Sequence, residues 1–442
     1  MNLVWFRNDL RTEDNNSLKA ACEENDAIIG VYFFDPRYYT ESDFGMNLKV
    51  DIPFGKTGKF RARFIQQAVK DLKSNLSDHE IPLLVFNDAP ENVIPRLVEE
   101  FSIKNIFLQT EWTRDETDQE NAVGKALEEK GLKVNLKGHR VYDQFLFHPD
   151  DIPYSIAEIP KVFTGFRKKL EKESKIRETV SIKGYQQKAF KVPETSIPTL
   201  EELGLEESET DSRSAFPWQG GETEAWNRLN DYFWQTKKLQ YYKKTRNGLV
   251  GTDYSSKFSA WLAIGCISAR QIYHEVKRFE NEVVENQDTY WLIFELIWRD
   301  FFKYVSLKHQ EKIFSISGIL EKEYEWNSDQ VALKQWIKGK TNEDFVNANM
   351  KEIAATGFMS NRGRQNVASY WSMHQEQDWR LGAAYFEHIL IDYDVHSNYG
   401  NWMYNSGVGN DPRNRTFNIK SQADRYDRDK KYRNLWLNER MF

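Results

Sequence analysis

Hydrophobic positions follow two different periods along the first third of the chain. Short apolar runs rich in Val, Ile and Phe alternate with longer segments whose apolar residues recur every three or four positions. Such runs are typical of strands buried on both faces, and the longer segments are typical of amphipathic helices. The pattern predicts strands at 3–6, 27–34, 81–86, 104–109 and 132–137, with helices near 16–25, 59–76, 91–101 and 115–130. Repeated strand–helix units predict a doubly wound α/β domain over residues 1–139, with a parallel sheet covered on both faces.

The rest of the chain follows the helical period. Residues 140–215 are polar and charged, which predicts an interdomain linker wrapped over the surface. From 216 to 442 the pattern predicts a second, all-α domain. Its segment DTYWLIFELIWRDFFKYV (288–305) is apolar nearly all round, as in a helix buried inside a large domain.

Composition narrows the class of protein. Of 442 residues, 40% are hydrophobic, enough for a sizeable core, and no apolar run approaches the length that crosses a bilayer. Met1 is followed almost at once by the strand-like LVWF, so we expect no signal or transit peptide and a cytoplasmic protein. The two cysteines, Cys22 and Cys266, lie far apart, which argues against a disulfide framework or a thiolate metal site.

Charge and aromatic content leave the function open. The net charge of −6 does not indicate a nucleic-acid-binding protein, although residues 411–442 carry nine basic against five acidic side chains. Such a run is also typical of a solvated mixed-charge surface. Aromatic residues form 14% of the chain, which suits core packing, base stacking or electron transfer. RNDLRTEDN (7–15) follows the first strand where a dinucleotide site would need glycines, which argues against NAD binding.

A series of motifs covers nearly the whole chain. In order they are LVWFRNDLRTEDN (3–15), HPDDIPYSIAEIPKVFTGFR (148–167), GGETEAWNRLNDYFW (220–234), YYKKTRNGLVGTDYSSKFSAWLAIGCIS (241–268), FELIWRDFF (294–302), ATGFMSNRGRQ (355–365) and SNYGNW (397–402). Together they resemble the photolyase/cryptochrome family, and in their details its cryptochrome DASH branch. The resemblance implies an α/β domain followed by a helical FAD-binding domain. It also implies light-dependent repair of cyclobutane pyrimidine dimers, preferentially in single-stranded DNA. We expect a monomer.

Flavin-binding residues follow from the resemblance. Hydroxyls and backbone N–H groups in YSSKFS suit a phosphate, although a serine-capped helix start is the commoner meaning of such serines. Arg364 is expected to pair with Asp392, either to stabilise a reduced anionic flavin or as a structural bridge. Asn398 is expected to face the central flavin nitrogen, where an amide can bond but cannot readily exchange a proton. The residues assigned to FAD are Tyr242, Ser255, Ser256, Lys257, Phe258, Ser259, Asn361, Arg364, Asp392, Asp394 and Asn398.

The close pair Asp392 and Asp394 would also suit a metal or a general acid and base. No further set of ligands stands near them in the sequence, so we expect no metal site.

The resemblance assigns substrate contacts as well. It places Glu295 at the lesion, beside Asn361 in the catalytic set, and it places Trp298 against the flipped-out bases and Arg299 on the DNA backbone. By sequence alone, Trp298 would be a core residue of an apolar helix. Tyr404 stands where conventional dimer photolyases carry a second stacking Trp, and Gln365 likewise follows the DASH pattern.

Electron transfer and light harvesting complete the implied set. Trp402, Trp379 and Trp326 match the family's three-tryptophan relay, although core packing is the usual role of any one Trp. DASH proteins usually bind a methenyltetrahydrofolate antenna, and Glu111, after the fourth predicted strand, is the candidate contact. Two alternatives to a repair enzyme are a blue-light photoreceptor with little repair activity and a non-catalytic nucleic-acid binder.

Overall fold

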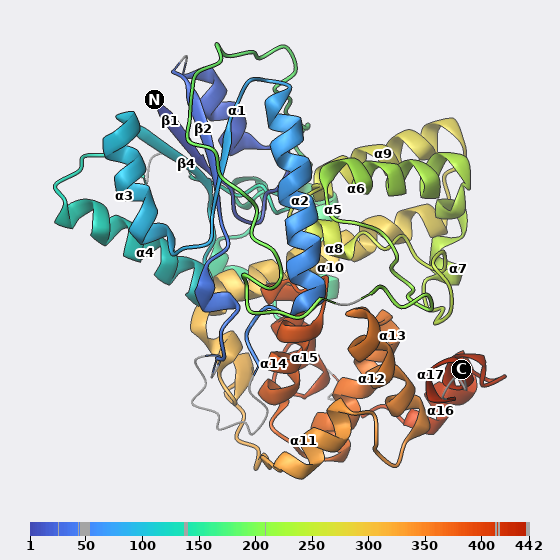
Figure 1. Ribbon diagram of the computed structural model, residues 1–442. Helices are drawn as coiled ribbons and strands as arrows, with labels where there is room; N and C mark the ends of the chain where they lie inside the picture. The colour runs from blue at the N-terminus through green and yellow to red at the C-terminus, as the bar shows by residue number, and fades with distance from the viewer. Residues whose placement is uncertain are drawn as a thin grey trace.

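The N-terminal part of the computed structural model is a three-layer α/β domain (Figure 1). The structure describes residues 1–438 except 25, 43, 45–53, 137–139, 208, 412, 414 and 415. Within these residues a parallel five-stranded sheet has the order β3-β2-β1-β4-β5. Its strands are β1 (Asn2–Trp5), β2 (Ile28–Phe33), β3 (Leu83–Phe86), β4 (Asn105–Gln109) and β5 (Arg140–Val141). This confirms the predicted doubly wound fold.

Helices cover both faces of the sheet. On one face α1 (Asn16–Glu23) and α2 (Lys59–Ser77) pack in a core with Val4, Ile28 and Phe107. On the other face α3 (Pro90–Phe101) and α4 (Arg114–Glu129) pack with Leu3 and Ile29. Neighbouring residues of one strand belong to different cores because side chains alternate across a strand. Both faces of the strands are therefore buried, which explains the continuous apolar runs in the sequence.

The predicted strand at 132–137 is wrong for its described residues. Among residues 132–136 the only pairing is an isolated bridge from Asn135 to Asn105, and residue 137 lies outside the described part. The last strand comes later, where Arg140 and Val141 pair with the end of β4. Leu132 and Val134 pack against the core of α3 and α4 without a ladder, so their alternation reflects burial at an edge.

The C-terminal part is helical, as predicted. It comprises α6 (Glu222–Asn230), α7 (Tyr242–Thr245), α8 (Ser259–Ala263), α9 (Ala269–Glu282), α10 (Gln287–His309), α11 (Gln330–Ile337), α12 (Asp344–Thr356), α13 (Asn361–Ser369), α14 (Trp379–Ile389), α15 (Val395–Asn405), α16 (Ile419–Tyr426) and α17 (Lys431–Leu437). No helix in the described part of the chain is long and apolar enough to cross a membrane.

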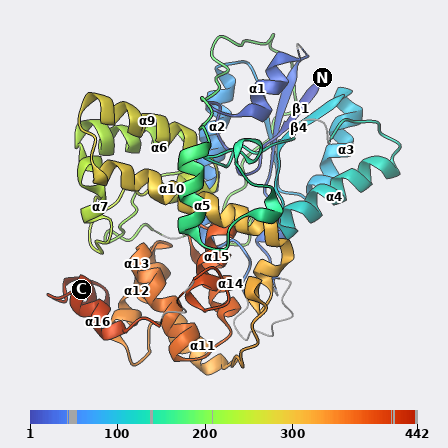
Figure 2. The ribbon, with the colours of Figure 1, turned by 180° about the vertical axis from the view of Figure 1, so that it is seen from behind.

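The connecting segment is only partly a surface linker. Its helix α5 (Phe163–Glu173) lies against α10, as the rear view shows (Figure 2). Phe145, Phe147, Phe163 and Phe166 are buried in the same core as the helical domain. The described residues from 174 to 221 contain no strand or α-helix. We retain 1–139, 140–215 and 216–442 as the proposed division of the chain.

The polar loop after β1 docks the helical domain. Glu222, at the start of α6, accepts hydrogen bonds from Thr12 N and Thr12 Oγ1 at 2.7 and 2.9 Å. The guanidinium of Arg11 donates to the carbonyl of Gly265 at 2.9 Å. The loop that lacks the dinucleotide fingerprint therefore serves as an interface between the two parts of the chain.

We expect Gly265→Ala to destabilise this interface strongly. Gly265 has φ +72°, and a Cβ there would lie 2.1 Å from the carbonyl oxygen of Asn8. Left-handed backbone costs a non-glycine residue about 1–2 kcal/mol, and overpacking adds about 1–3 kcal/mol. Gly251→Ala is the matched control, because Gly251 has φ +88° with nothing within 4 Å. Urea unfolding measures both, and equal losses of stability would contradict the close approach.

Candidate functional site

One side of α10 forms the wall of a cavity. The helix begins at an Asn286 cap, whose side chain accepts from the backbone N–H groups of residues 288 and 289. Phe294, Glu295, Trp298 and Phe302 recur at helical spacing and line a cavity of about 400 Å³. This is the size of pockets that hold large ligands, about 300–1,000 Å³. The helix is apolar nearly all round because one side packs in the core while the other faces this cavity.

Most of the predicted site residues line this cavity. They come from the segment around α7 and α8, from α10, from α13, from the segment before α15 and from α15 itself. They are Tyr242, Ser255, Ser256, Lys257, Phe258, Ser259, Glu295, Trp298, Arg299, Asn361, Arg364, Gln365, Asp392, Asp394 and Tyr404. Asn398 and Trp402 line an adjoining cavity of about 90 Å³, whose wall also includes Asn361, Arg364 and Asp392.

The expected Arg364–Asp392 pair is present. Nη2 of Arg364 donates to both carboxylate oxygens of Asp392 at 2.8 and 2.9 Å. Nε of Arg364 donates to the carbonyl of Met359 at 2.9 Å, which fixes the guanidinium against the segment that precedes α13. A fixed cation at the cavity wall can stabilise negative charge on a bound ring system.

Lys257 is a buried basic residue beside the cavity. Its side-chain nitrogen makes no hydrogen bond within the described residues, and the residue is 3% exposed. Burial lowers the pKa of Lys257 well below its ordinary value. Its backbone also adopts φ +67°, a conformation that non-glycine residues hold only where the surroundings impose it. An anionic group in the cavity would supply the missing partner, so this segment fits a cofactor diphosphate.

Arg228 holds the segment that carries Lys257, and the sequence alone did not reveal it. This arginine is 2% exposed. Its guanidinium donates to the carbonyls of Ser255 and Ser256, each at 3.2 Å. Those bonds hold the backbone of the segment, whose residues Ser255 and Ser256 line the cavity.

Asp394 and Asn398 are fixed by the start of α15. Asp394 caps the helix, accepting from Ser397 N at 2.7 Å, and pairs with Lys303 at 3.0 Å. Burial opposes ionisation, but Lys303 and Arg299 together hold the pKa of Asp394 below its ordinary value. Nδ2 of Asn398 donates to the carbonyl of Ala383 at 3.0 Å, so Oδ1 is the end that can accept a bond from a ligand.

Two aromatic rings form a corner in the cavity wall. Trp298 and Tyr404 are perpendicular, with ring centres 6.0 Å apart. Phe163 of α5 stacks on Trp298 at 3.7 Å and fixes the plane of the indole. The segment predicted as a surface linker thus supports the pocket from behind, a long-range contact that local periodicity could not reveal.

Glu295 lies beside this corner with a partner that the prediction did not include. Its carboxylate pairs with Arg246 at 2.8 Å, and its side chain is 26% exposed. Burial raises the pKa of Glu295, and Arg246 opposes that rise. Arg246 stands in the motif YYKKTRNG, so the family pattern could have identified it as a site residue.

Arg299 lies deeper than its predicted role requires. Its guanidinium donates to the carbonyls of Gln144 and Leu262, and Arg299 lines both the main cavity and a second cavity between the domains. These bonds tie α10 to the connecting segment and to α8. A contact of Arg299 with the DNA backbone stays a prediction.

Of the three predicted relay tryptophans, only Trp402 lines a cavity next to the main one. Trp402 reaches the adjoining cavity, and its ring passes so close to Gly382 of α14 that a Cβ there would lie 2.2 Å away. Trp379 is the first residue of α14. The backbone N–H of Asp378, just before it, donates to the carbonyl of Asn327, the neighbour of Trp326. No ring contact joins the three indoles directly within the described part of the chain. Their use as a relay stays a prediction.

Glu111 lies in the second cavity, which has a volume of about 150 Å³. It follows β4, at the carboxyl end of the sheet, as predicted. Its carboxylate accepts from the amide of Gln109 at 2.8 Å, and burial raises its pKa. The wall of this cavity also includes Arg299 and Asp394, so the two cavities are neighbours.

Comparisons with known proteins agree with this architecture. The family model described as DNA photolyase matches residues 2–187, and that of the FAD binding domain of DNA photolyase matches residues 291–441. Cryptochrome DASH of Gloeobacter violaceus is 44% identical over 438 residues, covering 99% of this chain and 85% of that protein. Cryptochrome DASH of Synechocystis sp. is 45% identical over 447 residues, covering 99% and 87%.

Solved structures are similar along the same length. A cryptochrome from Synechocystis sp. has a TM-score of 0.92 at 44% identity, covering 99% of this chain and 88% of that one. A class III photolyase from Agrobacterium tumefaciens has a TM-score of 0.81 at 26% identity, covering 99% and 86%. The chain therefore belongs to the photolyase/cryptochrome family, as a FAD-binding flavoprotein of its cryptochrome DASH branch.

Proposed function

We propose that this protein is a deoxyribodipyrimidine photo-lyase that repairs cyclobutane pyrimidine dimers in light, preferentially in single-stranded DNA. One observation carries the proposal: a single cavity collects an anion-binding end, around Lys257 and Arg364, and an aromatic corner, formed by Trp298 and Tyr404. When bound, photoexcited reduced FAD supplies the electron that opens the cyclobutane ring and afterwards recovers it.

The residues of the chain hold the two partners together. Lys257 and the serines around it would bind the FAD diphosphate, and the Arg364–Asp392 pair would lie beside the flavin ring system. Asn361 lines the main cavity and the adjoining cavity of about 90 Å³, so it could contact both the flavin ring system and the lesion. This arrangement would place donor and acceptor in one water-excluding site, where positioning contributes most to the rate.

The lesion would enter at the aromatic corner. A flipped pyrimidine pair can stack on the face of Trp298 opposite Phe163. Glu295 can accept hydrogen bonds from pyrimidine N–H groups, with Arg246 beside it. Flipping a base out of a duplex costs a few kcal/mol. The ring of Tyr404 is smaller than an indole, so its stacking offsets less of that cost. A lesion in a single strand avoids most of that cost, which supports the single-strand preference.

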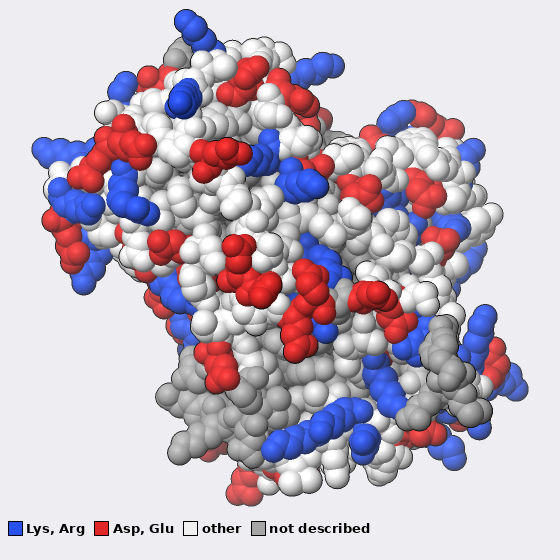
Figure 3. All heavy atoms as spheres, viewed as in Figure 1, with Lys and Arg blue, Asp and Glu red and all other residues white. Residues whose placement is uncertain are grey.

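Basic and acidic side chains are interspersed over the face seen in Figure 3, and several basic ones stand at the corner of α16 and α17. Near the cavity, Arg362 bonds to Gln365 at 2.9 Å and lies over the ring of Tyr426. We infer that a few such cations bind phosphates, so that affinity for DNA falls as salt rises.

We place the pterin ring system of a methenyltetrahydrofolate antenna in the cavity of about 150 Å³ between the domains. Glu111 can accept from the N–H groups of a pterin, and the amides of Gln109 and Gln144 hold its carboxylate at 2.8 and 3.4 Å. Because this cavity adjoins the main one, a folate bound there would lie near FAD.

The proposed function is tested by illuminating the purified protein under reducing conditions with dimer-containing oligonucleotides, single- and double-stranded. Repair of the single strand supports the proposal. Bound flavin without repair favours a blue-light photoreceptor, the second function that the family resemblance allows.

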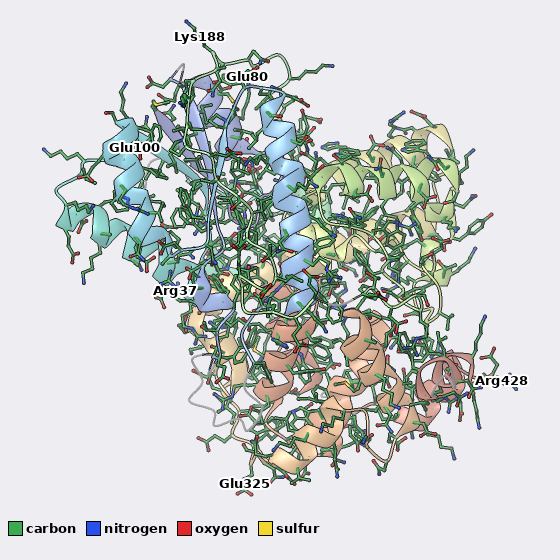
Figure 4. The ribbon with its side chains drawn as sticks, in the orientation of Figure 1. Arg37, Glu80, Glu100, Lys188, Glu325 and Arg428 are labelled. Atoms are coloured by element: carbon green, nitrogen blue, oxygen red, sulfur yellow. The ribbon has the colours of Figure 1, made fainter. Side chains whose placement is uncertain are left out.

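We expect Glu295→Ala to lower the repair rate roughly 10- to 150-fold, the value of one hydrogen bond to a charged group. Flavin absorption should stay unchanged, because Arg364 and Lys257 remain. Glu325→Ala is the control, since Glu325 is exposed at the far end of the helical part (Figure 4). Repair by Glu295→Ala at the rate of the control would contradict the assigned pocket.

A further inference from the structure

A half-buried tryptophan lies on α10 one helical turn before the residues of the cavity. Trp291, Glu295 and Trp298 stand at positions i, i+4 and i+7, so they share one face of the helix. Glu295 and Trp298 line the cavity, whereas Trp291 is not among the described residues of its wall. At a rise of about 1.5 Å per residue, Trp291 lies about 10 Å along α10 from Trp298. The face of α10 that forms the cavity therefore continues beyond the proposed lesion site.

One face of the Trp291 ring packs against the aromatic support of the cavity. Its ring centre lies 4.4 Å from that of Phe294, with 24° between the two planes. Phe294 lines the cavity and meets the edge of Phe163 at 5.2 Å. Phe163 is also the ring that stacks on Trp298. A continuous row of rings thus joins Trp291 to Trp298, and both indoles are held on the same support.

A lysine covers the other face of Trp291. Nζ of Lys243, on α7, lies 4.2 Å from the centre of the Trp291 ring. Because Phe294 stacks on one face of that ring, the ammonium lies on the opposite, outer face. Nζ also donates to Oε1 of Gln287, an exposed residue at the start of α10, at 2.8 Å. The outer face of Trp291 is therefore covered only by a long and flexible side chain among the described residues.

The charge of Lys243 is not neutralised as the charges of its neighbours are. Nζ of Lys244 lies 3.7 Å from a carboxylate oxygen of Asp288, and Arg246 pairs with Glu295 at 2.8 Å. Within the part of the chain that the structure describes, Lys243 has no carboxylate partner. An ammonium without an acidic partner attracts a phosphate, and an aromatic face beside it suits an unpaired base.

We propose that Trp291 and Lys243 form a subsite for the nucleotide next to the lesion in single-stranded DNA. The base of that nucleotide stacks on the outer face of Trp291, and the ammonium of Lys243 moves from the ring to the adjoining phosphate. This inference rests on the proposed function, because it takes the lesion to lie against Trp298 and Glu295.

The exchange on the Trp291 ring favours the bound strand. A stacked base contributes more free energy than an ammonium over a solvent-exposed ring, so the base displaces Lys243. The ammonium then gains a phosphate and releases the counterions condensed on it. In a duplex the same base must first leave its partner and its stacked neighbours, which costs free energy. The subsite therefore adds to the preference for a single strand.

Binding of short strands in the dark tests the proposal. The full-length protein with its flavin is titrated with a bare dimer dinucleotide and with dimers that carry one thymidine on the 5′ or the 3′ side, in competition with a labelled single strand. We expect the thymidine to raise the affinity of the wild type about 5- to 150-fold on one side of the dimer only, because α10 runs from the cavity in one direction. An abasic nucleotide in its place should give only the part of the gain that its phosphate contributes.

Trp291→Ala should remove the part of the gain that depends on the base, and Trp291→Phe, which keeps a smaller ring, should retain some of it. The gain is a ratio of two affinities of one variant, so any effect on the lesion site itself cancels. Trp234→Ala is the matched control, since Trp234 is also half-buried and has Arg278 4.5 Å from its ring centre. It does not line the cavity, and we expect the full gain in that variant.

Lys243→Met tests the phosphate contact separately. Loss of one phosphate contact on a single strand should reduce the slope of log affinity against log salt concentration by about 0.7. Lys169→Met is the control for this variant. Nζ of Lys169 likewise lies over an aromatic ring, that of Tyr154 at 4.3 Å, but Lys169 does not line the cavity, so the slope should keep its wild-type value.

The outcomes separate this inference from the proposed function. Equal affinity of the wild type for the thymidine and abasic strands on both sides overturns the inference, as does an equal gain in the wild type and Trp291→Ala. Either result leaves the proposed function intact. A wild type that binds none of the dimer strands overturns both. If Trp291→Ala does not fold, Lys243→Met decides, because it leaves the ring in place: an unchanged salt slope contradicts the proposal.

Discussion

Asp14→Ala is expected to lower the free energy of unfolding by about 3–5 kcal/mol, the usual cost of breaking a buried ion pair. Asp14 is fully buried and accepts hydrogen bonds from Arg270 at 2.8 and 3.0 Å, from Ser268 Oγ at 2.6 Å and from Val180 N at 3.1 Å. These partners belong to the helical domain and to the connecting segment. The substitution would leave the guanidinium of Arg270 with Asp143, at 2.9 Å, as its one acidic partner among the described residues.

Urea unfolding followed by flavin fluorescence measures this loss, and we expect flavin release to accompany it because the two domains separate. Glu91→Ala is the control: it breaks the pair with Arg37 at 2.9 Å, at the outer surface (Figure 4). Exposed pairs contribute about 0–1 kcal/mol. A loss of less than about 1 kcal/mol for Asp14→Ala would show that the buried network does not hold the domains together.

Trp298→Ala should weaken binding of a dimer-containing single strand about 5- to 150-fold, because one stacked base contributes roughly 1–3 kcal/mol. The indole is fixed between Phe163 and Tyr404, so little entropy is lost when a base stacks on it. Binding in the dark at constant salt, followed by fluorescence anisotropy, separates this effect from the photochemistry.

Trp234→Ala provides the comparison. Trp234 is also half-buried, donates to Glu275 at 3.0 Å and lies beneath Arg278, but it does not line the cavity. Its loss should leave the affinity for DNA within about twofold of the wild-type value, as expected of a residue away from the interface. Equal effects of the two substitutions would mean that Trp298 stabilises the fold and does not receive a base.

How well the sequence predicted the fold depended on how local the signal was. The helices of the first third agree with the prediction to within a residue or two, because each has its own apolar face. The strand at 132–137 failed because alternation records burial and says nothing of hydrogen-bonded pairing. The connecting segment was misjudged as wholly exposed because Phe145, Phe163 and Phe166 find their partners more than a hundred residues away.

The sequence by itself determined the α/β and helical division, the family, and which residue types gather at the site, since these depend on local periodicity and on motifs in fixed order. The tertiary structure alone decided that Arg246 pairs with Glu295, that Phe163 supports Trp298, and that Tyr432 of α17 bonds to Glu352 of α12. These contacts join segments distant along the chain, and their strength comes from burial and charge, which no local pattern of residues records.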